Sequence, residues 1–300
     1  MVILRHGDLI APGRYLRHSR FTRVANYQSD DRVLSLVTAT ADGGAGPLVL
    51  VLAERALPDV NQLTVTADGI VFLDGQRHEL CASRRYDSRI ALPAPQARGA
   101  LPANLSANLP RAAAFVAERG HASSWAYLLA LAPARPRPPA AAFERALAAR
   151  VEARVAELFG TPDLGGLCAV RGLGVGLTPS GDDFVCGYLH ARHLASRLGI
   201  RPFERRELPA ALCTGGDVLT RSFLRCAIAG AVSEPVQALL YLLCARPAAQ
   251  ELCAALERVL RMGETSGADW ATGLLLTLSR MTEPVARARR AEPGGAELPG

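Results

Sequence analysis

The sequence has 300 residues, 49% of them hydrophobic and 21% charged, a globular balance that fits two modest domains or one large one. All 34 basic residues are arginines, and they are scattered without interleaved aromatic residues, so we expect no nucleic-acid binding despite a formal charge of +6. The chain shows neither a membrane-length apolar run nor a signal-peptide pattern, and its seven cysteines form no CxxC pair. We therefore expect a cytoplasmic protein, without membrane association, whose thiols are reduced and mostly buried.

The first 95 or so residues have the pattern of short strands. Apolar and β-branched runs are separated by turns rich in glycine and aspartate, such as 41–46 and 67–69. With no helix between them, such strands favour an antiparallel sheet or a small barrel. The sequence predicts five or six strands, among them 33–38, 47–52, 63–66, 70–73 and 76–80.

The segment 91–100 marks a change in composition, after which the pattern is helical. Alanine, leucine, glutamate and arginine recur at helical spacing, with a proline-rich break at 133–139. The predicted helices are 111–118, 123–131, 141–159, 182–198, 217–231, 234–245, 248–262 and 268–280. We expect an α+β protein with a β-rich domain at 1–100, a helical domain at 101–283 and a flexible tail at 284–300.

A glycine-rich loop leads into the helix predicted at 182–198. Gly172, Gly174 and Gly176 allow positive φ angles and close approach to a ligand, and 178–180 has the sequence of a helix start. The free N–H groups of a helix start suit an anion, whereas the neighbouring Asp182 and Asp183 suit a cation or a proton. Phosphate-loop, dinucleotide-binding and nucleophile-elbow motifs are all missing from the sequence.

The start of that helix is repeated later in the chain. Residues 180–189 align without a gap to 266–275, sharing Ser-Gly-x-Asp-aromatic-x-x-Gly-x-Leu at an offset of 86 residues. Glycine inside a helix costs about 1 kcal/mol relative to alanine, so Gly187 and Gly273 indicate two helices in close contact. The repeat predicts two helix starts that converge on one site, with Asp183 and Asp269 as its carboxylates.

Simpler interpretations of these residues remain open. Ser-Gly-x-Asp is good helix-capping chemistry that requires no ligand, most of all at 266–269. Arg171 and Arg221 suit a phosphate or carboxylate, but each also suits a surface ion pair. His190 and His193, three residues apart on a helix, have no obvious third zinc ligand, so we expect solvent-exposed imidazoles.

The motif at 176–184, with Gly-Glu-Thr-Ser-Gly-Ala-Asp at 263–269 and the segment 222–230, resembles the AllH-like family, formerly a domain of unknown function. The resemblance implies a subunit of an oxamate carbamoyltransferase from allantoin degradation, a branch of purine catabolism, acting with AllG-like and FdrA-like partner subunits. It also implies reversible carbamoyl transfer between carbamoyl phosphate and oxamate, a small anionic substrate, to give oxalurate and phosphate.

The leading hypothesis is therefore a transferase subunit whose site lies between two helix starts. The alternatives are a non-catalytic scaffold subunit and a Mg²⁺-dependent phosphoryl-transfer enzyme. No cofactor is certain, but Mg²⁺ is possible, with Asp182 and Asp183 as its ligands. The expected catalytic residues are Asp183, Asp269 and Ser180. The expected substrate- or phosphate-binding residues are Gly174, Gly176, Thr178, Ser180, Gly181, Arg171, Thr265, Ser266, Gly267 and Arg221.

Overall fold

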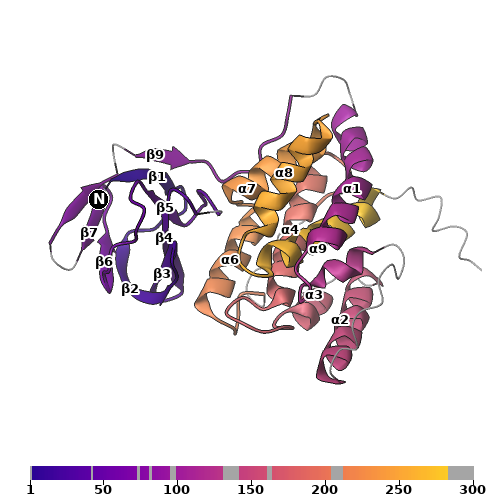
Figure 1. Cartoon of the computed structure of the whole chain (residues 1–300), viewed down its shortest axis with the longest axis horizontal. Helices are drawn as coiled ribbons and strands as arrows, with labels where there is room; N and C mark the ends of the chain where they lie inside the picture. Colours follow the sequence, from indigo (N-terminus) through magenta and orange to yellow (C-terminus); the bar gives the residue numbers. More distant parts are fainter. Residues whose placement is uncertain are drawn as a thin grey trace, which may run out of the picture.

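The structure, a computed structural model, consists of a curled N-terminal sheet followed by a group of helices (Figure 1). It describes residues 2–41, 43–72, 75–80, 83–94, 99–130, 142–160, 164–203 and 212–282. The α+β class predicted from the sequence is confirmed. The proline-rich break at 133–139 and the predicted tail from 284 lie outside the described residues.

The sheet has nine strands in the described part of the chain, in the order β8-β7-β6-β2-β3-β4-β5-β1-β9. The prediction of five or six strands was wrong, because β1, β2, β3 and β9 contain polar residues and lack a clear apolar alternation. Neighbouring strands are antiparallel except for β4 with β5 and β1 with β9, which are parallel. The strands are β1 Ile3–Gly7, β2 Gly13–Arg20, β3 Val24–Ser29, β4 Arg32–Thr38, β5 Val49–Leu52, β6 Gln62–Val65, β7 Gly69–Phe72, β8 Arg77–Glu79 and β9 Arg84–Tyr86.

The described residues after the sheet form eight α-helices and one short 3₁₀ helix. No helix in this described part is both long and apolar enough to cross a membrane. The helices are α1 Ala100–Arg119, η1 Trp125–Leu129, α2 Ala142–Gly160, α3 Leu164–Val170, α4 Ser180–Arg197, α6 Val218–Ala229, α7 Glu234–Cys244, α8 Ala249–Leu260 and α9 Ser266–Thr282.

Most predicted helices are present, but three differ from their prediction. Helix α1 starts eleven residues before Arg111, because Pro102 lies in the first turn, where no N–H donor is required, and buried Leu105 and Leu109 anchor that part of the helix. The helix expected at 123–131 is the 3₁₀ helix η1. Helix α3 was not predicted, because its two glycines have a low intrinsic helix propensity.

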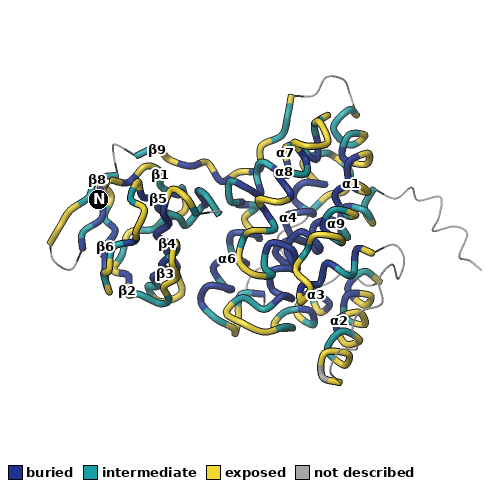
Figure 2. The backbone as a smooth tube through the Cα atoms, viewed as in Figure 1, coloured by how far each residue is buried: buried dark blue, intermediate teal, exposed yellow. Residues whose placement is uncertain are grey.

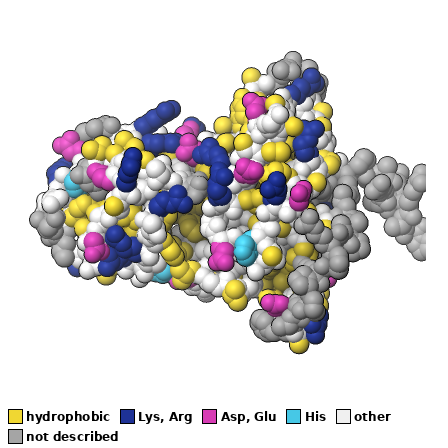
Figure 3. Space-filling view, in the orientation of Figure 1, with side chains coloured by type: hydrophobic (Ala, Val, Ile, Leu, Met, Phe, Trp, Pro, Cys, Tyr) yellow, Lys and Arg dark blue, Asp and Glu magenta, His cyan; other side chains and the backbone are white. Residues whose placement is uncertain are grey.

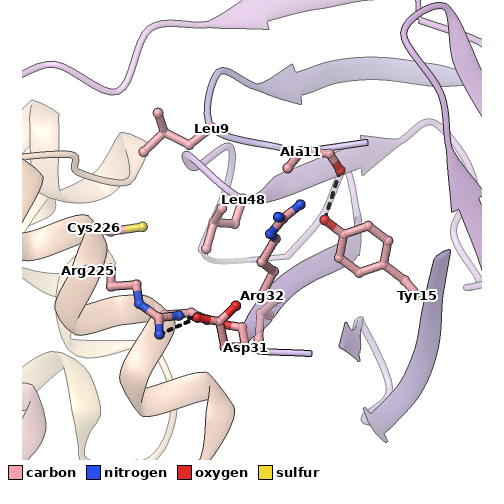
Figure 4. Close-up of a pocket in the computed structure, with 10 residues that line it drawn as sticks. Leu9, Ala11, Tyr15, Asp31, Arg32, Leu48, Arg225 and Cys226 are labelled. Atoms are coloured by element: carbon pink, nitrogen blue, oxygen red, sulfur yellow. Dashed lines mark hydrogen bonds and ion pairs between the residues drawn. The ribbon is translucent and has the colours of Figure 1, made fainter. Parts of the chain in front are cut away.

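The two parts of the molecule meet along β4 and α6. Strand β4 is buried on both faces: Leu34 and Leu36 belong to the core inside the curled sheet, whereas Val33 packs against Val218 and Leu219 of α6. A small hollow of about 190 Å³ lies at this junction. Figure 4 shows Arg225 of α6 reaching across it to Asp31, with which it forms an ion pair of 2.6 Å.

Helix α4 is the central element of the helical part and is buried along most of its length (Figure 2). It packs along α9, which is almost equally buried, and also contacts α3 and α6. The burial includes polar side chains of α4, among them Asp182, Asp183 and His190, which therefore need partners within the protein. The six described cysteines are free thiols, but only Cys186, Cys226 and Cys244 are buried, so burial is less general than predicted.

Two glycines set the distance between α4 and α9. A Cβ atom added to Gly187 would lie 2.0 Å from the carbonyl oxygen of Trp270, and one added to Gly273 would lie 2.1 Å from that of Phe184. Gly187 and Gly273 are matching positions of the sequence repeat, as are Phe184 and Trp270. The contacts are therefore reciprocal, and the two helices run in the same direction from neighbouring starts.

We expect Gly187→Ala to lower the free energy of unfolding by about 2 kcal/mol or more, because backbone atoms leave no room for a methyl group. Gly160→Ala is the matched control: Gly160 is also helical, but an added Cβ would have no atom within 4 Å, so stability should stay the same or rise slightly. Urea denaturation measures both variants. Equal stability of Gly187→Ala and the wild type would contradict the close contact.

Candidate functional site

The glycine loop has the backbone conformation expected from its sequence. Gly172, Gly174 and Gly176 have φ angles of 70°, 114° and 96°, which side-chain-bearing residues rarely adopt. A Cβ atom at Gly174 would also lie 2.7 Å from the backbone nitrogen of Ser180, so the loop folds back onto the start of α4. Between these glycines, Val175 is 80% exposed, which places the tip of the loop at the surface.

Asp182 and Arg171 hold this loop in place. The Asp182 carboxylate is buried and accepts hydrogen bonds of 3.1 Å from the Nε of Arg171 and from the backbone N–H of Gly172. Arg171 also donates to the carbonyl oxygen of Thr214 at 2.9 Å. These two side chains, predicted as a metal ligand and an anion contact, therefore already have partners within the protein. Arg221, the other predicted anion contact, donates to the carbonyl oxygen of Gly216.

The starts of α4 and α9 have the same local construction. The second residue of each helix is a glycine that lies against a carbonyl oxygen of the preceding helix. A Cβ atom added to Gly181 would lie 2.0 Å from the carbonyl oxygen of Val170, and one added to Gly267 would lie 1.9 Å from that of Val259. Each glycine also donates its N–H to the loop before it, at 2.8 and 2.9 Å. The sequence repeat thus corresponds to a repeated helix–loop–helix unit.

Four hydroxyl groups near the two helix starts contact the aspartates, the serines those of the opposite helix and the threonines those of the helix that follows them. Thr178 Oγ1 lies 3.0 Å from Ser266 Oγ, which joins the starts of α4 and α9 directly. Asp183 of α4 accepts hydrogen bonds from Ser266 and Thr178. Reciprocally, the side chain of Asp269 of α9 accepts hydrogen bonds from the hydroxyls of Ser180 and Thr265.

This crossing differs from ordinary helix capping. The residue before α4 is Pro179, and no side chain caps that helix. The serine of each repeat instead donates a hydrogen bond to the aspartate of the other repeat. Each serine–aspartate pair therefore requires both helices. The structure therefore brings together Ser180, Asp183, Ser266 and Asp269, as the repeat predicted, although their chemical roles stay predictions.

Burial makes both carboxyl groups hard to ionise. It raises the pKa of Asp183 to about 8, and although the hydrogen bonds from Ser266 and Thr178 favour ionisation, the charges of Asp269 and Asp182 oppose it. Burial also raises the pKa of Asp269, against the hydrogen bonds that it accepts. Near neutral pH, Asp183 is therefore mostly a neutral carboxylic acid, which donates a hydrogen bond instead of repelling an anion.

Each of these two aspartates also has one oxygen without a partner. The Oδ2 atoms of Asp183 and Asp269 are buried, and neither has a hydrogen-bond partner among the described residues. Asp269 is fully buried and Asp183 is 9% exposed. Because an unpaired buried polar atom costs free energy, each of these oxygens favours a proton or a further hydrogen-bond donor.

One contact to this pair was not predicted. The backbone N–H of Trp125, at the start of η1, donates to Asp269 Oδ1 at 2.6 Å. This donor is 144 residues away in the chain, and it is a backbone group, so no residue type in the sequence signals it. Helix η1 thus closes the far side of the Asp269 carboxylate.

The expectation of solvent-exposed imidazoles at His190 and His193 was wrong. Both rings are buried, and their Nε2 atoms lie 3.1 and 2.9 Å from the carbonyl oxygens of Ala231 and Ile228. The indole N–H of Trp270 donates to His190 Nδ1, so His190 must carry its proton on Nε2. Burial lowers the pKa of His190 to about 4, which keeps it neutral. In the part of the chain that the structure describes, no three His, Cys, Asp or Glu residues group to hold a metal.

Comparison with known proteins finds a family model that matches the helix pair. The model for oxamate carbamoyltransferase subunit AllH matches residues 170–278, from the end of α3 into α9. The matched segment includes the glycine loop and both Ser-Gly-x-Asp motifs, so the resemblance predicted from these motifs is confirmed. No curated protein and no solved structure matches the chain.

The raised pKa of Asp183 predicts a pH-dependent stability. An acid whose folded pKa is about 8, against an ordinary value of 3.8, stabilises the fold below pH 4 and loses that contribution as the pH rises to 8. Wild-type stability should fall by up to ~1.4 kcal/mol per pH unit in this window relative to Asp183→Asn, which cannot ionise. Urea denaturation at pH 5, 6.5 and 8 measures the difference.

Asp68→Asn, the same change at an aspartate whose side chain is 80% exposed, is the control and should follow the wild type. If the wild type and Asp183→Asn lost stability in parallel over this range, Asp183 would be ionised in the fold, and its role as a neutral acid would be excluded.

Proposed function

We propose that this chain, whose residues 170–278 match the AllH family model, is a subunit of an oxamate carbamoyltransferase complex that takes part in the transfer itself. The observation that supports a direct role is the reciprocal Ser–Asp arrangement between α4 and α9. The same matched segment supplies both halves of it. AllG-like and FdrA-like subunits are the expected partners.

The proposed reaction moves a carbamoyl group from phosphate to nitrogen. The amide nitrogen of oxamate attacks the carbamoyl carbon of carbamoyl phosphate, a C–N bond forms, and the bond from carbon to the bridging phosphate oxygen breaks. Phosphate leaves with that electron pair, the nitrogen loses a proton, and oxalurate remains. Such a transfer requires orientation and stabilisation of the charge that develops on the carbamoyl oxygen, but no protein nucleophile.

A neutral Asp183 suits this chemistry better than an ionised one. Two carboxylates would repel anionic substrates, but a carboxylic acid with a pKa of about 8 donates a hydrogen bond to a developing oxyanion. In the proposal, Ser180 and Ser266 orient the two carboxyl groups, and Asp269 is held by η1. Backbone N–H groups of the neighbouring helix starts supply further positive potential for phosphate.

The carboxylate of oxamate needs a cation elsewhere. Arg171 is paired with Asp182 and is 11% exposed, so it contributes to the loop more than to a substrate. Arg221, at the start of α6, has one hydrogen-bond partner among the described residues and is partly exposed, which leaves N–H groups for a carboxylate. We therefore assign this contact to Arg221 rather than to Arg171.

A scaffold role is the second candidate, and burial is the observation that favours it. Asp269 has no exposed surface, and the hydroxyls of Thr178, Ser180 and Ser266 all have partners within the protein. In this alternative, the crossed bonds only lock α4 to α9, and the substrates bind to the partner subunits.

Activity of the reconstituted complex tests the proposal. We expect the chain with its AllG-like and FdrA-like partners to release phosphate from carbamoyl phosphate only when oxamate is present. Asp183→Ala and Ser180→Ala should each lower kcat at least ~100-fold, in the range seen when one preorganised donor is removed. Asp68→Ala and Ser196→Ala, exposed residues of the same types, are the matched controls and should keep full activity.

Thermal denaturation and assembly with the partners establish that the variants are folded. Full activity of folded Asp183→Ala and Ser180→Ala complexes would exclude the catalytic role. If the isolated chain also failed to bind carbamoyl phosphate in calorimetry, the scaffold would be the correct alternative.

A further inference from the structure

A second hollow, of about 480 Å³, lies where β1 and β9 of the sheet meet the helical part. Neither Asp183 nor Asp269 lines it. It is bounded by β1, β9, the segment 87–91 and the ends of α4 and α7. Figure 3 shows arginine side chains gathered where the sheet meets the helical part. The lining residues are Arg5, Arg84, Arg85, Tyr86, Asp87, Arg89, Ile90, Ala91, Arg197 and Gln237.

The backbone places some of these positive charges next to one another. In the parallel pairing of β1 with β9, Arg5 lies opposite Arg84 and His6 lies opposite Arg85. Like charges on neighbouring positions of paired strands destabilise a sheet. Burial, together with the charge of Arg85, lowers the pKa of His6, so Arg85 also disfavours a second positive charge there. The fold therefore maintains a local excess of positive charge at some cost in stability.

Acidic residues compensate only part of this charge. Arg5 pairs with Glu234 at 2.9 Å, and Arg89 pairs with Asp87, whose pKa its hydrogen bonds lower to about 2. Among the described residues, the side chain of Arg85 has one hydrogen bond, a long one of 3.3 Å to the carbonyl oxygen of Asp8. The side chains of Arg84 and Arg197 are exposed and have no ion pair or hydrogen bond among the described residues.

The backbone around this hollow is held in place. Arg5 lies over the ring of Tyr86, with its guanidinium carbon 5.5 Å from the ring centre, and the Tyr86 hydroxyl donates to the carbonyl oxygen of Val232. Gln237 of α7 donates to the carbonyl oxygens of Asp87 and Arg89, which fixes the segment that leaves β9. The backbone that carries Arg84 and Arg85 is therefore fixed, and only the arginine side chains have to become ordered when a ligand binds.

We propose that this hollow binds a small molecule with two or more phosphate or carboxylate groups, recognised by Arg84, Arg85 and Arg197. Guanidinium groups bind phosphate and carboxylate oxygens in the same two-pronged way, so both groups satisfy this chemistry. The volume is within the range of metabolite sites and exceeds what a single inorganic anion fills. The site shares no residue with the proposed transfer site and does not depend on that function.

Calorimetric titration of the full chain with pyrophosphate and, separately, with citrate tests the proposal and distinguishes a phosphate ligand from a carboxylate ligand. We expect saturable binding of at least one probe with one site per chain. Arg84→Gln/Arg197→Gln should weaken it roughly a hundredfold, about tenfold for each guanidinium–anion hydrogen bond that the substitutions remove. Both side chains are exposed, so the variant should remain folded, as circular dichroism would confirm.

Arg77→Gln/Arg154→Gln is the matched control, since it removes two exposed arginines that do not line the hollow and changes the net charge equally. It should bind the probes as the wild type does, and so should Asp183→Asn. The proposal is overturned if neither probe binds, if Arg84→Gln/Arg197→Gln binds normally, or if both double variants lower the affinity equally, because the attraction would then be diffuse. All three readouts are independent of carbamoyl transfer.

Discussion

The close contact between α4 and α9 is the constraint on which the rest of the helical part depends. Gly187 and Gly273 each let the opposite backbone approach to a distance that a single methyl group would prevent. Because the contacts are reciprocal, the two helices start side by side and run in the same direction. Every feature of the candidate site follows from this: the Thr178–Ser266 contact, the crossed serine–aspartate bonds and the mutual repulsion of the two carboxyl groups.

The contact between two parallel helix starts also affects the ionisation of the aspartates in their first turns. Their dipoles place two positive ends at one point, which favours negative charge in the first turns. Burial has the opposite effect, since it disfavours a charged carboxylate. The outcome differs by position: Asp182 is paired with Arg171, whereas Asp183 has no cationic partner in the part of the chain that the structure describes and retains a proton near neutral pH. Adjacent aspartates in one sequence motif thereby acquire different chemistry.

Arginines that are scattered along the sequence come together where the sheet meets the helices. Along the sequence the arginines look evenly spread, and a lysine-free chain with 34 of them gives no obvious basic surface. Pairing of β1 with β9 brings Arg5 beside Arg84, and the end of α4 brings Arg197 to the same hollow. Folding thus concentrates scattered charges, because strand pairing and helix packing bring together residues that are far apart in the sequence.

Local patterns in the amino-acid sequence were enough to predict the α+β class, most helices and the pairing of the two helix starts. Helical periodicity and a ten-residue repeat with glycine at matched positions are local signals, and close helix contact is the main physical reason for glycine inside a buried helix. Three features depend on the tertiary structure: the serines bond to the aspartates of the opposite helices, the backbone N–H of Trp125 donates to Asp269, and His190 and His193 are buried. The same holds for the arginine-rich β1, β2 and β9, whose polar strands are held by their neighbours in the sheet. Hydrogen bonds between distant backbone groups and burial by distant elements leave no pattern in the local sequence, so they become visible only in the folded chain.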